Sequence, residues 1–126
     1  MVDSGIDENS AEFTGRISSL SADFAGTRGL QDVGGHGTAV SSVLLAAKDD
    51  INMHGVAFGA TLLVLRTDTP GTCVDPDPDA GCTHADSAMA RALDRATSAG
   101  ARVVNFSLGG SPPNATLRAA MSRATA

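Results

Sequence analysis

The sequence predicts an α/β fold in the form of a doubly wound parallel sheet. Two largely apolar runs of strand length, residues 62–65 and 103–108, are typical of strands covered on both faces. Between them, residues 86–99 have helical periodicity, and a strand, a helix and a strand in that order form a right-handed parallel unit. The chain has no Trp or Tyr and only 3% aromatic residues, so aliphatic side chains must build the core, which favours a buried parallel sheet.

The N-terminal half of the chain contains two weak strand signals and one helix. Residues 1–3 are interpreted as the end of a strand and residues 16–20 as a weak strand candidate, whereas glycines mark residues 25–35 as a loop. The stretch 36–48 predicts a helix because its apolar residues share one helical face: Val40, Val43, Leu44 and Ala47.

The C-terminal half alternates more clearly between strands and helices. Residues 61–67 predict a buried strand, and an acidic, proline-containing loop follows over 70–83. After the helix at 86–99, residues 102–108 predict a second buried strand. Asn114 is expected to cap a last helix that runs to about residue 123.

The composition indicates a globular domain with no attraction for nucleic acid. The 126 residues are 42% hydrophobic and carry a net charge of −5, and the arginines are scattered rather than gathered in a basic stripe. We find no signal peptide and no apolar run that approaches the roughly 18 residues of a membrane span. Met1 leads at once into Val-Asp-Ser-Gly, which looks like the interior of a domain, so residues 1–126 are expected to be one incomplete domain with a cropped start.

The two cysteines, Cys73 and Cys82, lie nine positions apart in the acidic loop. We favour a local disulfide in a secreted protein. Closing a loop of about ten residues would contribute on the order of 2–3 kcal/mol in the chain-entropy model. A metal site that includes His84 and a pair of free thiols remain as alternatives.

Asp3 directly follows an apolar strand and is followed by small residues and glycine. Its expected place is the carboxyl end of a parallel strand, where open α/β sheets put their functional sites. Ordinary turn chemistry of an Asp-Ser-Gly sequence explains the pattern about as well.

His36 stands between two glycines at the start of the predicted helix. The positive end of a helix opposes protonation of a nearby histidine, so a base placed there needs an anionic partner. An aspartate that accepts the Nδ1 proton would fix the imidazole tautomer and stabilise the imidazolium. The simpler interpretation is a histidine that only begins a helix.

The strand predicted at 102–108 ends in the sequence Ser107-Leu108-Gly109-Gly110. Its glycines would permit a peptide to lie close against the main chain. An ordinary transition from strand to turn is the alternative.

Taken together, these segments resemble the subtilase family of serine proteases (peptidase S8). Residues 2–6, followed by Asn9, match the family's aspartate motif, and residues 36–40 match its histidine motif except for Ala39, where a second histidine is common. The 33 positions between Asp3 and His36 are close to the family spacing. Residues 55–60 are similar to the family's Gly-Val-Ala-Pro-x-Ala segment, with Phe58 in place of the proline.

The resemblance implies a role for each matching residue. Asp3 would orient and support His36, which would act as general base and then as general acid. The cleft for a polypeptide substrate would be walled by Ser107, Leu108 and Gly109 on one side. Gly81 and Thr83 would belong to the strand on its other side. No cofactor is required.

The acidic insertion between the cysteines, with residues 83–87 after it, resembles the autotransporter subtilases of Gram-negative bacteria. That resemblance implies a secreted or cell-surface protein, and it supports the disulfide.

Two parts of the family pattern are missing from these 126 residues. The nucleophile motif of Gly-Thr-Ser-Met-Ala type is absent, and so is the Ala-Gly-Asn segment of the oxyanion hole, since Asn105 lies inside a predicted strand. We therefore expect a truncated subtilisin-like fold whose full-length parent is an endopeptidase, while this chain alone is inactive. The missing C-terminal half is an expected partner, and the open edge at 103–108 predicts oligomerisation.

Calcium is considered at residues 47–53, which correspond in position to a calcium-binding loop of many subtilases. Asp49, Asp50 and Asn52 offer oxygen donors of the right kind. A solvated acidic turn is the alternative.

Two other classes of function remain open at this point. One is a non-catalytic α/β module that binds peptides along the segment around Ser107. The other is an unrelated α/β hydrolase or phosphate-binding domain that uses Asp3. A phosphate site would need a basic residue near the glycine-rich turn at 34–37, and none follows until Lys48.

Overall fold

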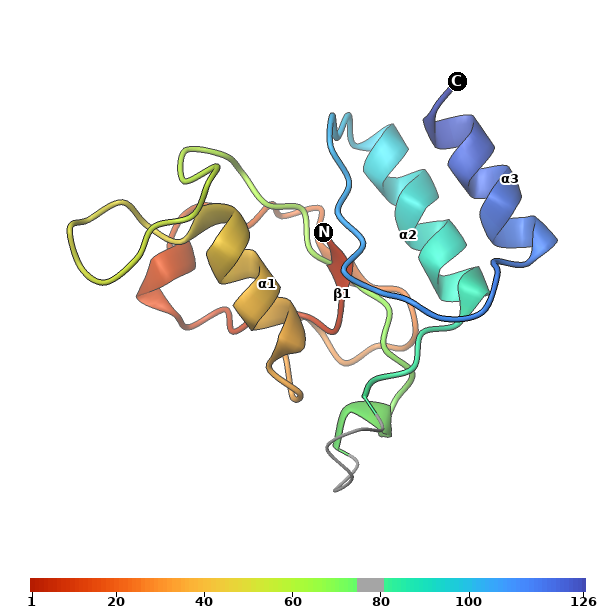
Figure 1. Cartoon of the computed structure of the whole chain (residues 1–126), viewed down its shortest axis with the longest axis horizontal. Coiled ribbons are helices and arrows are strands. Elements are labelled where there is room, and N and C mark those ends of the chain that lie inside the picture. The colour runs from red at the N-terminus through yellow and green to blue at the C-terminus, as the bar shows by residue number, and fades with distance from the viewer. Residues whose placement is uncertain (75–80) are drawn as a thin grey trace.

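The computed structural model describes residues 1–74 and 81–126, which form a small α/β fold with a parallel three-stranded sheet (Figure 1). Among these residues, no helix is long and apolar enough to cross a membrane. The elements in chain order are β1 (Val2–Asp3), the 3₁₀ turn η1 (Ala11–Phe13), β2 (Ala22–Asp23), α1 (His36–Leu45), β3 (Leu65–Arg66), the 3₁₀ turn η2 (Thr72–Val74), α2 (Asp86–Ser98) and α3 (Ala115–Ala124).

The sheet has the order β1-β3-β2, with both outer strands parallel to β3. Across it, Leu65 pairs with Val2 and Ala22, and Arg66 pairs with Asp3 and Asp23. The register therefore lines up three charged residues at the carboxyl edge of the sheet, the edge at which parallel sheets carry their sites.

The regular strands are shorter than the sequence predicts. The predicted strand at 61–67 keeps regular pairing at Leu65 and Arg66, and the weak candidate at 16–20 contributes a single bridge from Ile17 to Leu62. The chain turns between these pairings, and the Ser21 hydroxyl accepts a hydrogen bond of 2.9 Å from the amide of Val64. A side chain thus replaces a backbone partner and interrupts the ladder.

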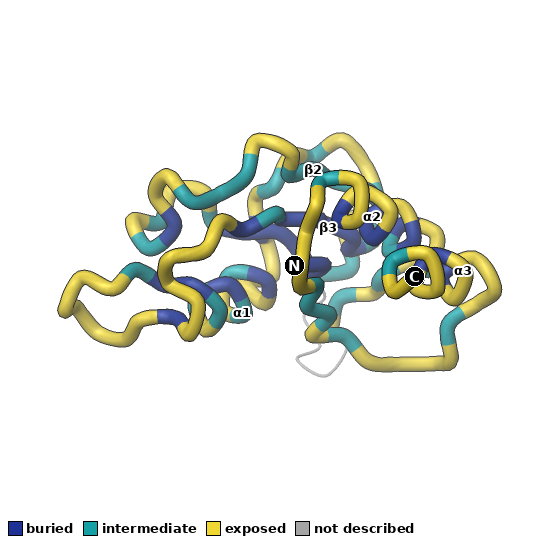
Figure 2. The backbone as a smooth tube through the Cα atoms, turned by 90° about the horizontal axis from the view of Figure 1, so that it is seen from above, coloured by how far each residue is buried: buried dark blue, intermediate teal, exposed yellow. Residues whose placement is uncertain are grey.

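Helices cover both faces of the sheet, which confirms the predicted fold class. Val64 packs with residues of η1 and α1 such as Phe13 and Leu45, whereas Leu65 packs against Ala92 and Ala96 of α2. Neighbouring residues of a strand point to opposite faces, so two cores form on either side of β3. Figure 2 shows the buried stretch of chain running between α1 and α2.

The last helix packs on α2 rather than on α1. Ala90 and Leu93 of α2 form a third cluster with Leu117 and Ala120 of α3. The start of α3 confirms the predicted cap, because the Asn114 side-chain oxygen accepts a 3.0 Å hydrogen bond from the amide of Leu117.

The prediction of a buried strand at 102–108 is wrong. The segment makes one bridge to the sheet, between Phe106 and Val2, supported by a 3.0 Å hydrogen bond from the amide of Val2 to the carbonyl of Asn105. Val103 is 85% exposed, and Phe106 is only half-buried. The apolar pattern is that of a covered strand, but the segment lies beside β1 at the outer edge of the sheet, so one of its sides stays open.

Candidate active site

Asp3 lies at the carboxyl end of β1 and is completely buried. Its Oδ1 accepts a 2.7 Å hydrogen bond from the amide of Ser4. The chain then turns away at Gly5, whose φ of +116° favours glycine and where a Cβ would come within 2.3 Å of the Leu30 carbonyl oxygen. The sharp turn after β1 thus fixes the carboxyl group at the edge of the sheet.

His36 is the first residue of α1, and its Nδ1 lies 2.7 Å from Oδ1 of Asp3. The close approach depends on Gly37, because a Cβ at that position would lie 2.2 Å from the carbonyl oxygen of Gly5. The His36 side chain is 52% exposed, whereas that of Asp3 is 0% exposed. One ring nitrogen is therefore held by a buried carboxylate while the rest of the imidazole stays accessible.

The hydrogen bonding of the pair defines the histidine tautomer. Within the described residues, Oδ2 of Asp3 is buried without a hydrogen-bond partner, so the donors to this carboxylate are the Ser4 amide and His36 Nδ1, both at Oδ1. An ionised carboxylate only accepts hydrogen bonds, so the neutral imidazole carries its proton on Nδ1. Its Nε2 is then an acceptor, which is the state that a general base requires.

Asp32 supports the Asp3–His36 pair, and the sequence analysis did not identify it. This buried carboxylate accepts hydrogen bonds from the Gly35 amide (3.0 Å), from the amide and hydroxyl of Thr38 (2.8 and 2.7 Å) and from the Ser4 hydroxyl (2.8 Å). The Ser4 hydroxyl in turn accepts from the Gly37 amide at 3.0 Å. Asp32 thus ties the start of α1 to the end of β1 and holds His36 against Asp3.

The environment of Asp32 favours its charged form. Burial works to raise the pKa of this carboxyl, but the hydrogen bonds from Thr38, Ser4 and Gly35 outweigh burial and lower the pKa below its usual value. A signal for this role exists in the sequence. The residue before α1 is Gly35, which has no capping side chain, and Asp32 is the nearest preceding acidic residue.

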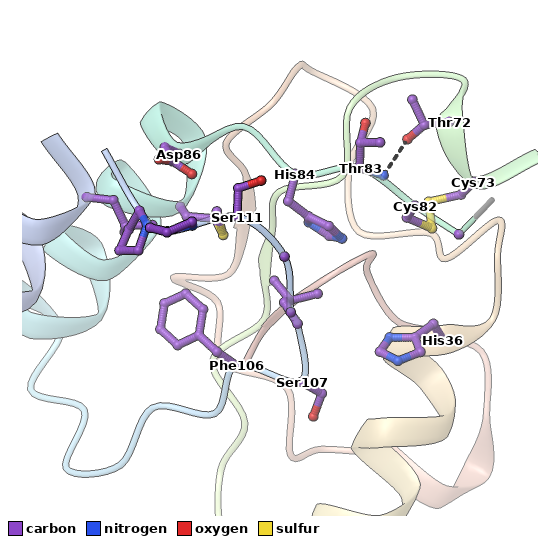
Figure 3. Close-up of a pocket in the computed structure, with 18 of the residues that line it drawn as sticks. His36, Thr72, Cys73, Cys82, Thr83, His84, Asp86, Phe106, Ser107 and Ser111 are labelled. Carbon is purple, nitrogen blue, oxygen red and sulfur yellow. Dashed lines mark hydrogen bonds between the residues drawn. A yellow bond between two sulfur atoms is a disulfide. The ribbon is translucent and has the colours of Figure 1, made fainter. Parts of the chain in front are cut away.

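The predicted substrate-binding residues line one open cleft of about 980 Å³ (Figure 3). Ser107 and Thr83 lie on opposite sides of the cleft (Figure 3), and Leu108, Gly109, Gly81 and His36 line it as well. The structure thus brings the two predicted substrate segments together with the histidine. Phe106 and His84, which the sequence analysis did not assign to substrate binding, line the cleft as well.

The cysteines are joined as a Cys73–Cys82 disulfide, and both line the cleft. The Thr83 amide donates a 3.1 Å hydrogen bond to the Thr72 hydroxyl beside the disulfide (Figure 3). The bridge therefore fixes the wall formed by Gly81 and Thr83. The metal-site alternative is not supported, since the cysteines are bonded to each other and His84 Nδ1 pairs with Thr67; the acidic residues at 75–80 lie outside the described residues.

A comparison with protein families agrees with this geometry. The model of the subtilase family matches residues 1–126, the whole of the chain. The chain belongs to the subtilase family. No curated protein is a significant match to this subtilase chain.

Beside the aspartate and histidine of this subtilase chain lies an ion-pair network. The Arg66 guanidinium contacts Asp68 at 2.7 Å, and Arg28 contacts both Asp68 and Asp23 at 2.9 Å. The hydrogen bonds to Asp23 and Asp68 raise the pKa of Arg28. Burial acts to raise the pKa of Asp23, but the hydrogen bonds from Arg28 and from the Ala25 amide outweigh burial and lower it. The network provides ion-pair partners for Arg66 and Asp23, two of the three charged residues that the sheet register places at its carboxyl edge.

The calcium candidates lie in an exposed loop after α1. Asp49 accepts a 3.0 Å hydrogen bond from the Ile51 amide. Asp50 and Asn52 have left-handed backbones, with φ angles of 65° and 57°. Both residues line a hollow of about 280 Å³. In the part of the chain that the structure describes, no three His, Cys, Asp or Glu side chains gather as a metal site. Calcium at this loop stays a prediction.

Proposed function

We propose that this chain supplies the aspartate and histidine of a serine endopeptidase active site. The observation that carries the proposal is the 2.7 Å contact between Asp3 Oδ1 and His36 Nδ1, made by a buried carboxylate and an imidazole that opens on the cleft. Membership of the subtilase family, a family of serine proteases, supports it.

In the proposed reaction, Nε2 of His36 takes the proton from a serine hydroxyl as its oxygen attacks the carbonyl carbon of the scissile peptide bond. Asp3 keeps the imidazole oriented and stabilises the imidazolium that forms. The imidazolium then gives its proton to the leaving amine, and water hydrolyses the acyl-enzyme by the same proton transfers. The serine and the oxyanion-hole donor would come from residues outside positions 1–126.

The cleft supports a polypeptide substrate. The segment 107–109 directly follows Phe106, which bridges to β1 at the sheet edge, and its Ser107 lies across the cleft from Thr83 (Figure 3). An extended peptide placed between two such segments can form main-chain hydrogen bonds with them, which is a common way of binding peptides. The glycine at position 109 leaves room for close approach.

We further propose that the 126-residue chain does not hydrolyse peptides by itself. Loss of the nucleophile costs about 10⁶ in rate in serine proteases of the subtilisin type, and these residues contain no replacement motif. A secreted or cell-surface location, as in autotransporter subtilases, is supported by the Cys73–Cys82 disulfide, because disulfides persist in oxidising compartments.

The test is to sequence the source locus beyond Ala126 and to express the natural gene product next to the 126-residue chain. We expect an in-frame nucleophile segment, peptide hydrolysis by the natural product, and none by the short chain. Peptide binding without hydrolysis by the natural product would refute the enzyme and favour a peptide-binding module. Steady hydrolysis by the short chain would refute its proposed dependence on an external serine.

A further inference from the structure

His84 is a half-buried histidine in the cleft that the proposed reaction does not use. It follows directly after Thr83 on one wall, and an isolated bridge joins it to Asp68 after β3. In Figure 3 its imidazole lies among the cleft-lining side chains, on the side of Thr83 that faces His36. A peptide bound between the two walls would pass beside this ring.

Thr67 holds the His84 ring through one nitrogen. The Thr67 hydroxyl and His84 Nδ1 lie 2.9 Å apart, and Thr67 is completely buried at the end of β3. Within the described residues, the Thr67 hydroxyl makes no other hydrogen bond. A buried hydroxyl that donates to nothing costs about 1–3 kcal/mol, so the favoured arrangement is the one in which Thr67 donates and Nδ1 accepts. The imidazole proton is then on Nε2.

The surroundings of His84 favour its neutral form. Burial, together with the nearby His36, lowers the pKa of this imidazole below its ordinary value near 6.5, while the negative charges of Asp3 and Asp68 and the Thr67 backbone oppose the shift only in part. Neutral His84 with its proton on Nε2 presents a single hydrogen-bond donor to the cleft and no charge.

The charges around the cleft determine which kind of hydrogen-bond acceptor can approach the Nε2–H donor of His84. Among the described residues that line the cleft there is no Lys or Arg, and Asp86 is one of the lining residues. The whole chain carries a net charge of −5. A substrate carboxylate would therefore be repelled, whereas a neutral acceptor such as an amide carbonyl would not.

On this basis we propose that His84 is a specificity-determining residue of the cleft, which donates from Nε2 to a neutral hydrogen-bond acceptor, an amide side chain, of the bound peptide. The inference rests on the proposed function, because it assumes that a peptide occupies this cleft. Thr67 is the positioning residue that fixes the ring and its tautomer.

The first part of the test needs no substrate. Nitrogen NMR of the imidazoles in the 126-residue chain should show His84 protonated at Nε2 at pH 7. Thr67→Val, which removes the hydroxyl at nearly constant volume, should give a mixture of tautomers, and Thr67→Ser should restore the Nε2 form. A His84 protonated at Nδ1 in the unaltered chain would overturn the proposal.

The second part measures peptide affinity by amide shifts of residues 81–83 and 107–110. The probes are pairs of extended peptides in which one position carries Asn or its near-isostere Leu, scanned along the peptide. At the position that meets His84 we expect the Asn peptide to bind about 3- to 10-fold more tightly, the size of one added hydrogen bond. His84→Leu should remove this preference with little change for the Leu peptide, and His84→Gln, which keeps a donor, should retain much of it.

The outcomes separate this inference from the proposed function. Peptides that bind with the same preference in His84→Leu as in the unaltered chain would overturn the role of His84 and leave the cleft intact. Peptides of every sequence that leave both walls unshifted would overturn the peptide cleft itself and His84 as its specificity residue.

Discussion

Two regions beside the same cleft are stabilised by different numbers of hydrogen bonds. Around Asp3, Asp32 and His36 the side chains and the backbone of the first turn of α1 are joined by a continuous set of hydrogen bonds between 2.7 and 3.0 Å. The segment 103–110 has one bridge to β1, and Val103 is 85% exposed.

The proposed chemistry and the proposed peptide recognition therefore depend on different kinds of interaction. Hydrogen bonds to a charged, buried carboxylate are worth about 1.5–3 kcal/mol each, so the aspartate–histidine pair is organised by this chain itself. The segment 103–110 is anchored mainly by Val104, Phe106 and Leu108, which are partly buried against the core, and it has few backbone hydrogen bonds. Such segments open at low free energy, so this wall is expected to need a neighbour, such as a bound peptide or an adjoining strand, to become rigid.

The largest expected effect is on catalysis. In the natural gene product, His36→Ala should lower kcat for peptide hydrolysis by about 10⁶, the size known from subtilisin-type proteases, because the general base is removed. The matched control is His54→Ala, an exposed histidine that packs edge-on against Phe58, which should leave kcat unchanged. Equal activity of the two variants would rule out His36 as the base.

The next largest effect tests the rigid region by its stability. Asp32→Ala removes the acceptor of four hydrogen bonds and should lower the free energy of unfolding of the chain by about 3 kcal/mol, measured by urea denaturation. In calcium-free buffer the control is Asp49→Ala, at an exposed carboxylate that caps a turn, which should change the free energy of unfolding by less than about 0.5 kcal/mol.

The same carboxylate gives stability a dependence on pH. Since the folded-state pKa of Asp32 is lowered, its contribution is fully present above the unfolded value near 3.9 and is lost as the pH falls through the lowered folded value. Between about pH 2 and 5, the free energy of unfolding should therefore depend more steeply on pH in the unaltered chain than in Asp32→Asn. If the free energy of unfolding depends on pH equally in the two proteins, the folded chain does not favour the ionised form of Asp32.

We expect the Cys73–Cys82 disulfide to have an intermediate effect on the free energy of unfolding. Replacing both Cys73 and Cys82 by Ser should lower the free energy of unfolding by about 2–3 kcal/mol, because the closed loop of about ten residues no longer restricts the unfolded chain. The amide of Thr83 should lose hydrogen-exchange protection, while that of Gly37 should keep it. Loss of protection at both Thr83 and Gly37 would show that the disulfide-linked wall and the start of α1 do not open independently.

The smallest effect belongs to the open segment. Val103→Ala should change the free energy of unfolding by less than about 0.5 kcal/mol, since the side chain is 85% exposed. Val2→Ala, at a completely buried valine that bridges to the same segment, should cost about 2 kcal/mol. If the Val103 variant is as unstable as the Val2 variant, the edge at 103–110 is covered in solution.

Local patterns in the sequence predict where the helices lie, because capping and helical periodicity depend on neighbours in sequence: Asn114 marks the start of α3. The predicted apolar face of α1 is only partly right, since Val43 is 57% exposed while Leu45 is buried, and the helix ends at Leu45 instead of continuing through Ala47. The contact between Asp3 and His36 was expected from the family resemblance. Without it, either motif has an ordinary structural explanation.

Features that depend on distant partners could not be predicted. Val103 has the pattern of a covered strand residue, but its exposure is decided by what lies beside the sheet edge and not by its own segment. His84 was considered as a metal ligand, whereas its nitrogen pairs with Thr67, 17 positions earlier in the chain. Asp32 lies in a glycine-rich loop whose path, rather than its composition, carries its carboxylate to Ser4 and Thr38.

Labelling of the natural gene product with a serine-directed fluorophosphonate would show whether Asp3 and His36 activate a serine nucleophile. We predict covalent labelling of one serine outside residues 1–126, a large loss of labelling rate in His36→Ala, and no labelling of the 126-residue chain alone. Labelling that is as fast in His36→Ala as in the unaltered protein, or that falls on a serine within residues 1–126, would contradict this prediction.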